Sequence, residues 1–186
     1  NRILESETAG MNRNQKYLRG LFCGGTFCDE AIAQLQEYIG DVWSNTPKRE
    51  ELRLNDTFVS KEHTVIDLGD EEFTMGRPHP VIDPEPVRMA ILREGRKEDT
   101  AVLLLDFILG PAINPDPVGS VIEQIKEVKK SHSAIGGYLS VVASVCGTDG
   151  DPQNLTRQTQ LLEEAGVVVM RSNAQAARLA GLIAKH

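Results

Sequence analysis

Short apolar runs alternate with amphipathic segments along most of this chain. The clearest run is the unbroken apolar stretch at 101–105, which is typical of a strand buried on both faces of a parallel sheet, and 138–145 predicts another buried strand. The same pattern predicts more strands and several helices: strands at 17–22, 41–45, 63–68 and 167–170, and helices at 27–39, from about 86 onward, at 118–131, at 152–165 and at 174–184. The alternation predicts an α/β fold of three layers, in which helices cover both faces of a doubly wound, mainly parallel sheet.

Three segments depart from this pattern. Residues 47–63 are ambiguous, with 56–60 either a strand or part of an insertion. Residues 76–86 hold too many prolines for regular structure before a helix opens near Pro86. Residues 1–16 are polar and charged, and we interpret them as a linker or tail from an upstream region because the chain starts with Asn. Residues 17–186 are then expected to form a single domain.

Charge and cysteine content narrow the classes of partner. The net charge is −7, the pI is about 5.1, and no Lys/Arg cluster offers a face for nucleic acid. No apolar run is long enough to span a membrane. We expect no signal peptide, because residues 1–16 are polar and charged and lack an apolar central stretch. Three cysteines do not indicate a disulfide framework, so we expect buried, reduced and inert thiols at Cys23, Cys28 and Cys146 in a cytoplasmic protein. We expect His63 and His132 at the surface.

A glycine turn joins the first predicted strand to the first long helix. Gly24 and Gly25 let the backbone bend there and let a ligand approach without a Cβ in the way. The first helical turn then points backbone N–H groups at that spot, where the helix dipole favours an anion. Thr26 or Asp29 could supply the capping oxygen. The alternative is an ordinary strand-to-helix corner.

Polar and glycine residues also follow the other predicted strands. Because the carboxyl ends of parallel strands meet at one edge of the sheet, these residues are expected to converge on one ligand site. The segments concerned are Cys23–Thr26, Asp67–Asp70, Asp106 with Gly110, Cys146–Asp149 and Arg171–Asn173.

Several nearby groups have two interpretations each. Arg77 could clamp a phosphate or carboxylate beside His79, or both could tie their proline-rich loop to the domain. Asn114 could make a fixed hydrogen bond or cap the next helix. The acidic side chains of Asp67 and residues 70–72 could hold Mg²⁺, or form a solvated turn. No other metal site is expected.

Five segments carry a resemblance to a known family: YLRGLFCGGTFCDEA, IDLGDEEFTMGRPHPVIDP, LLLDFILGPAINPDP, VVASVCGTDGDPQ and GVVVMRSNAQAARLA. These segments, in this order, closely resemble the FdrA family, within the superfamily of succinyl-CoA synthetase alpha subunits and NDP-forming acyl-CoA synthetases. The resemblance covers residues 16–184. It implies one ligase domain of flavodoxin-like fold from a longer protein, in which CoA or a nucleotide could bind elsewhere. No cofactor is expected in this domain.

The resemblance also implies roles for individual residues. Gly24, Gly25 and Thr26 match a Ser-Gly-Thr turn that cradles a phosphoryl group, and Asp106 matches a Glu that orients a phosphorylated histidine. Gly69 and Asp70 match part of a Gly-Gly-Asp turn. Gly147 and Thr148 match the start of the loop that bears this histidine. The chain departs from the family here, because no histidine lies between Ser133 and Lys185.

Two functional hypotheses follow. The first is an FdrA-type ligase domain that binds a small phosphate- or carboxylate-bearing substrate for acyl or carbamoyl transfer, with Asp106 and His79 as catalytic groups and Arg77 as an anion ligand. The resemblance points to anaerobic purine (allantoin) breakdown and to an oxamate carbamoyltransferase shared among subunits. The second is a non-catalytic domain that assembles with other domains or subunits of its complex.

Overall fold

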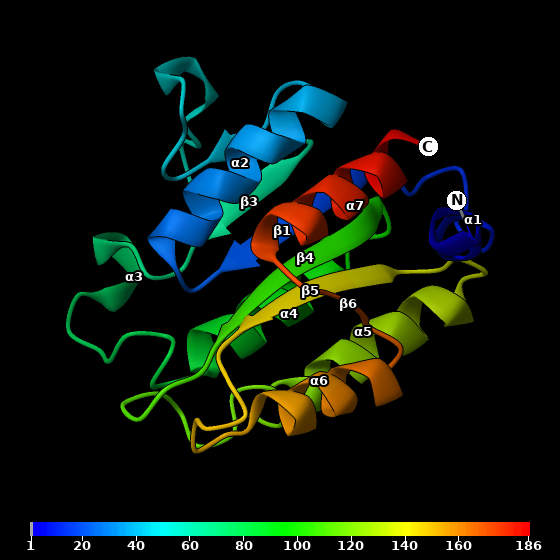
Figure 1. Ribbon diagram of the computed structural model, residues 1–186. Coiled ribbons are helices and arrows are strands. Elements are labelled where there is room, and N and C mark those ends of the chain that lie inside the picture. The colour runs from blue at the N-terminus through cyan, green and yellow to red at the C-terminus, as the bar shows by residue number, and fades with distance from the viewer. Residues whose placement is uncertain (1) are drawn as a thin grey trace.

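A single six-stranded parallel sheet forms the centre of the molecule in the computed structural model, which describes residues 2–186 (Figure 1). Its strand order is β2-β3-β1-β4-β5-β6. The strands are β1 (Tyr17–Phe22), β2 (Trp43–Ser44), β3 (Thr64–Asp67), β4 (Thr100–Ile108), β5 (Ser140–Cys146) and β6 (Val168–Met170). All neighbouring strands pair in parallel, which confirms the predicted doubly wound α/β fold.

Helices cover both faces of this sheet. They are α1 (Arg2–Thr8), α2 (Gly25–Ile39), α3 (Glu71–Thr74), α4 (Glu85–Gly95), α5 (Ile122–Ala134), α6 (Leu155–Glu164) and α7 (Asn173–Lys185), with a short 3₁₀ turn at Glu50–Leu52. Figure 1 shows α2 and α7 side by side on one face and α4, α5 and α6 on the other. The sheet and its two helical layers make the three layers that the sequence predicts.

The core consists of two apolar clusters, one on each face of the sheet. Side chains alternate along a strand, so Leu104 packs toward α2 and α7 whereas Leu105 packs toward α4 and α5. Asp106 follows Leu105 and points to the same face as Leu104. The apolar run therefore places one carboxyl group inside the sheet, on the α2 face.

The chain reverses direction across the sheet between β1 and β4. After β1 it runs outward to β2 and returns through β3, and after β4 it continues to β5 and β6 on the other side. The carboxyl ends of β1 and β4 therefore flank the topological switch point, which is where open α/β sheets bind ligands.

Several sequence predictions need correction. The segment at 56–60 forms no strand, and β2 covers only two of the five residues predicted for it. His132 is 1% exposed and not a surface residue, because its Nε2 pairs with the Gly95 carbonyl at 2.8 Å and its Nδ1 lies 3.1 Å from Gln15 Nε2. His63 is half-buried, and its Nδ1 accepts a hydrogen bond from the backbone of Leu18.

The segment expected to be a linker contains α1, which packs beside α7. Glu7 is buried and accepts hydrogen bonds from Ser140 Oγ at 2.7 Å and from the Tyr138 hydroxyl. This segment is thus attached to the sheet, while its link to an upstream region stays a prediction. Among residues 2–186, no helix has the length and apolar content that crossing a membrane requires.

Candidate functional site at the switch point

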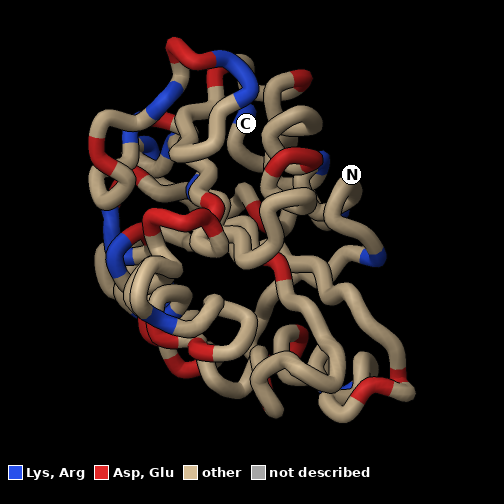
Figure 2. The backbone as a smooth tube through the Cα atoms, turned by 90° about the vertical axis from the view of Figure 1, so that its left-hand side faces the viewer, with Lys and Arg blue, Asp and Glu red and all other residues tan. Residues whose placement is uncertain are grey.

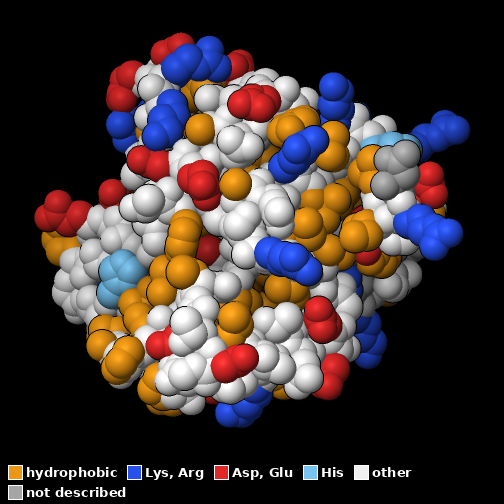
Figure 3. Space-filling model, viewed as in Figure 1, with side chains coloured by type: hydrophobic (Ala, Val, Ile, Leu, Met, Phe, Trp, Pro, Cys, Tyr) orange, Lys and Arg blue, Asp and Glu red, His pale blue; other side chains and the backbone are white. Residues whose placement is uncertain are grey.

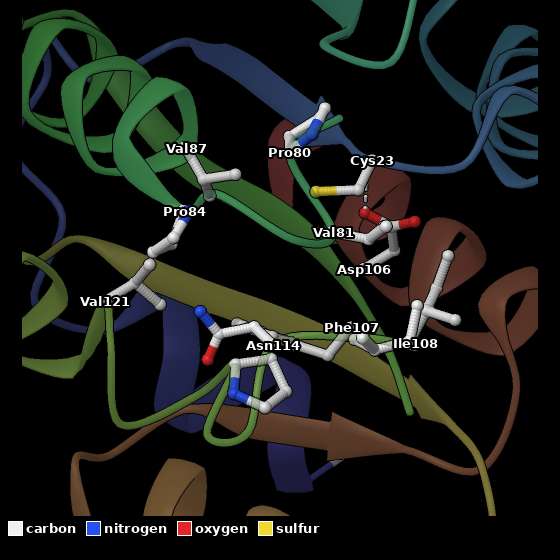
Figure 4. Close-up of a pocket in the computed structure, with 12 residues that line it drawn as sticks. Cys23, Pro80, Val81, Pro84, Val87, Asp106, Phe107, Ile108, Asn114 and Val121 are labelled. Carbon is white, nitrogen blue, oxygen red and sulfur yellow. Dashed lines mark hydrogen bonds between the residues drawn. The ribbon is translucent and has the colours of Figure 1, made fainter. Parts of the chain in front are cut away.

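The side chain of Asp106 closes the switch point from the β4 side. It is 4% exposed, and its two oxygens accept hydrogen bonds from the backbone N–H groups of Cys23 at 2.7 Å and Gly24 at 3.0 Å (Figure 4). These donors lie at the end of β1, 83 and 82 residues away in the chain. Asp106 therefore fixes the glycine turn to the neighbouring strand.

Burial dominates the electrostatics of Asp106. Desolvation raises the pKa of this carboxyl group to about 7, the hydrogen bonds from Cys23 and Gly24 oppose the rise, and the nearby Asp67 carboxylate adds to it. Asp106 is therefore poised to gain or lose a proton near neutral pH. Burial, together with Asp106 and Asp67, also holds the pKa of the Cys23 thiol well above its ordinary value, so this thiol is inert at neutral pH.

The first turn of α2 presents free backbone donors beside Asp106. Within residues 2–186, the N–H groups of Gly25, Thr26 and Phe27 have no hydrogen-bond partner. Gly25 and Thr26 are exposed. The prediction that Thr26 or Asp29 caps this helix is wrong, because Gly24 is the N-cap residue and no side chain caps it. Three amides at a helix N-terminus therefore remain open to a ligand.

Asp67 and His79 border the same turn from the β3 side. Asp67 accepts a hydrogen bond from Gly69 N at 2.8 Å, and a Cβ placed on Gly25 would lie 3.0 Å from its other oxygen. A Cβ placed on Gly69 would lie only 2.6 Å from His79 Nε2, so the imidazole rests on this glycine. Burial raises the pKa of Asp67, and His79 works against that rise. The structure thus brings His79, Gly69 and Gly25 together around Asp67.

Asp70 and Asn114 hold loops at this edge. Asp70 caps α3 by accepting a hydrogen bond from Glu72 N at 3.2 Å. Asn114 donates from its backbone to the carbonyl of Val81 at 2.8 Å and from its side chain to that of Ile82 at 3.2 Å. Of its two predicted roles, Asn114 therefore makes fixed hydrogen bonds between two loops.

A mainly apolar pocket lies beneath Asp106 on the α4 side. It is small, with about 30 Å³ of accessible volume, and its lining consists of Cys23, Asp106, Asn114 and apolar side chains from Pro80, Val81, Pro84, Val87, Phe107, Ile108, Ile113, Pro117 and Val121 (Figure 4). At this volume the pocket has room for little more than one or two water molecules.

Some predicted site residues lie elsewhere. Arg77 is exposed and lines a different hollow, together with Phe58 and Met89, so the structure does not bring it to Asp106. Thr148 is exposed, and its N–H and hydroxyl both donate to Asp151 in a closed turn. Gly147 packs against the side chain of Leu109. The hydrogen-bonding groups of Thr148 are therefore used within this turn.

The carboxyl edge is acidic. Figure 2 faces this edge and shows more Asp and Glu than Lys and Arg across its middle, and Figure 3 shows hydrophobic side chains gathered beside it, at the left of that view. The acidic groups include Asp67, Asp106 and residues 70–72. In the part of the chain that the structure describes, no three His, Cys, Asp or Glu side chains are placed to hold a metal ion. The groups that can attract an anion at this edge are therefore the backbone amides at the start of α2.

The sequence did not reveal two features of this edge. Asn45 positions Asp67 by accepting from its backbone N at 2.9 Å and donating to its carbonyl at 3.0 Å, and no motif marks this role. Cys146 is exposed, unlike Cys23 and Cys28, so the prediction of three buried thiols is wrong for this residue. It lies at the end of β5 in register with Ile108, two strands away from Cys23.

Comparison with known proteins shows which family the chain resembles. A family model described as CoA-ligase matches residues 21–183. YahF of Escherichia coli (strain K12), described as an uncharacterized protein, is 45% identical over 178 residues, a match that covers 96% of this chain and 35% of YahF. The chain therefore spans about a third of the length of this relative.

Two solved structures resemble the fold. One is the apo form of the dinucleotide forming acetyl-coenzyme A synthetase 1 of Ca. Korarchaeum cryptofilum, with a TM-score of 0.56, 15% identity, and coverage of 98% of this chain and 36% of that chain. The other is PH0766 from Pyrococcus horikoshii OT3, with a TM-score of 0.55, 14% identity, and coverage of 96% and 39%. At these identities the likeness shows the fold alone.

Proposed function

Because the chain belongs to the CoA-ligase family, we propose that it binds a phosphate- or carboxylate-bearing substrate at the N-terminus of α2 and serves acyl or carbamoyl transfer in an FdrA-type protein. The observation that carries the proposal is the set of three unpaired amides at Gly25, Thr26 and Phe27, beside the topological switch point. A longer parent protein would supply the remaining substrates and any CoA or nucleotide.

Each group at the turn has a distinct task in this proposal. The amides of Gly25, Thr26 and Phe27 bind the anionic end of the substrate. Asp106 holds the turn rigid through Cys23 and Gly24, and its buried carboxyl group can exchange a proton with the reacting group. His79 lies on Gly69 next to Asp67 and acts as a second polar group. A rigid donor set of this kind stabilises charge that develops during group transfer.

No step runs through a phosphohistidine of this domain, because the turn after β5 contains none. After incubation with radiolabelled ATP, this chain should therefore stay unlabelled. A stable, acid-labile label on the chain would contradict this part of the proposal.

Anion binding can be tested by removing a single amide. Gly25 is the first residue of α2, where proline is tolerated, and Gly24 before it has the extended backbone that proline requires (φ −107, ψ 116). Gly25→Pro deletes one free N–H, while the control Gly25→Ala adds a Cβ at the same place and keeps it. Isothermal titration with phosphate, carbamoyl phosphate and CoA should show binding of at least one ligand.

The proline variant should bind that ligand about tenfold more weakly than the alanine variant, since a hydrogen bond to a charged group contributes roughly 1.5–3 kcal/mol. Equal affinities would show that the amide is not used. No binding by any of the three ligands would leave the second candidate, a non-catalytic assembly domain. The exposed apolar side chains of Phe58, Met75 and Met89 favour that candidate.

A further inference from the structure

Two buried carboxyl groups flank the glycine turn at the start of α2. A Cβ placed on Gly24 would lie 3.3 Å from Oδ2 of Asp106, and one placed on Gly25 would lie 3.0 Å from Oδ2 of Asp67. Asp106 is 4% exposed and Asp67 is 7% exposed. An anion that accepts hydrogen bonds from the first amides of α2 would therefore lie close to both carboxyl groups.

No cationic side chain neutralises these two carboxyl groups. Within residues 2–186, neither Asp67 nor Asp106 forms an ion pair. The dipole of α2 corresponds to about half a positive charge at its N-terminus, which is too little to balance an anion and two carboxylates. Because both side chains are buried, water screens their charges poorly. Anion binding is therefore unfavourable here unless a carboxylate gains a proton.

The groups around Asp106 indicate where this proton goes. Asp106 faces the Cys23 thiol from β1 and the Asp67 carboxyl group from the end of β3, and on β5 it pairs with Ser144, which does not ionise. Arg171 follows β6 and lines a hollow together with Ser144, but it is exposed. Burial raises the pKa of Asp106 to about 7 and that of Cys23 well above its ordinary value. Asp106 can therefore gain a proton near neutral pH, whereas Cys23 already carries its own.

We propose that the site binds its anion together with one proton, which the carboxyl group of Asp106 takes up from solvent. This inference rests on the proposed function, because it needs an anion at the α2 amides. A bound anion stabilises the neutral form of Asp106, and by linkage the neutral form strengthens anion binding by the same factor. Affinity therefore rises as pH falls through neutrality, and it levels off once Asp106 is protonated in the free protein as well.

The pH dependence of sulfate binding tests the proposal. Sulfate resembles phosphate and binds at helix N-termini, and its own charge is constant between about pH 6 and pH 9. Isothermal titration should give about tenfold tighter binding at pH 6 than at pH 9, because each pKa unit by which the anion shifts Asp106 changes the affinity tenfold. Titration in two buffers of different ionisation enthalpy should show uptake of about half a proton per sulfate near pH 7.5.

Three variants identify the group that takes up the proton. Asp106→Asn cannot ionise and should lose both the pH dependence and the proton uptake. Asp29→Asn removes the same charge from an exposed position on α2, so it is the matched control and should keep both. Histidine side chains also titrate near neutral pH, and His79→Gln should likewise keep both.

The outcomes separate this inference from the proposed function. Sulfate binding with equal affinity at both pH values and no proton uptake would refute the inference and leave the proposed function intact. A pH dependence that persists in Asp106→Asn, or disappears in His79→Gln, would assign the proton to another group and also refute it. If an NMR titration near pH 6 shows no shift of the Gly25 and Thr26 amides, both proposals fail. The wild-type measurements do not depend on the folding of any variant.

Discussion

Neutralising Asp106 should remove a specific pH dependence from the stability of the protein. Burial raises the pKa of this carboxyl group to about 7, against an ordinary value of 3.8. The folded state thus binds more protons than the unfolded chain between these two values, and the contribution of Asp106 to stability falls as pH rises through this window. This contribution of Asp106 to the unfolding free energy falls by about 3–4 kcal/mol between pH 4 and pH 7, at about 1.36 kcal/mol per pKa unit.

The assay compares urea unfolding of wild type and Asp106→Asn across this pH range. Asparagine keeps the shape and one acceptor oxygen but cannot ionise. Relative to the variant, wild type should lose about 2–3 kcal/mol of unfolding free energy between pH 5 and pH 7. Ser144→Ala is the control, because Ser144 pairs with Asp106 across β4 and β5 and does not ionise in this range. Its curve should run parallel to that of wild type.

Parallel curves for wild type and Asp106→Asn would refute the reasoning, since they would mean that Asp106 has the same pKa in the folded and unfolded states. A slope of opposite sign would mean that the amides of Cys23 and Gly24 stabilise the carboxylate by more than burial penalises it.

Three further predictions concern other parts of the molecule. Glu94→Gln should lower the unfolding free energy by about 3–5 kcal/mol in urea titrations. The reason is that the guanidinium of Arg19, which is 2% exposed, would lose its buried counter-charge. An unchanged urea midpoint of unfolding would count against this ion pair. Gly69→Ala should cost about 1–3 kcal/mol by the same measurement, since the new Cβ would lie 2.7 Å from the carbonyl oxygen of Cys23. Iodoacetamide should modify Cys146 in the native protein and Cys23 only after unfolding. Mass spectrometry of the digested protein would show which cysteine is modified. Rapid labelling of Cys23 in the native protein would contradict its burial.

Much of the fold was predictable because its signals are local. The apolar run at 101–105 has the length and composition of a strand buried on both faces, and it lies within β4. Prolines excluded regular structure at 76–84, where the chain forms only turns before α4. The glycine turn before α2 was visible for the same reason: bending and helix initiation depend on a few consecutive residues.

The sequence determined which segments become strands and helices, and that their carboxyl ends carry polar and glycine residues. Only the tertiary structure decided which of these polar and glycine residues contact one another. Strand order places Asp106 beside Cys23, so a carboxylate occupies two amides that the turn alone would offer to a ligand. Packing buries His132 and separates Arg77 from the switch point. Periodicity and turn chemistry report neighbours along the chain, whereas these contacts join residues far apart in it and depend on how whole layers pack.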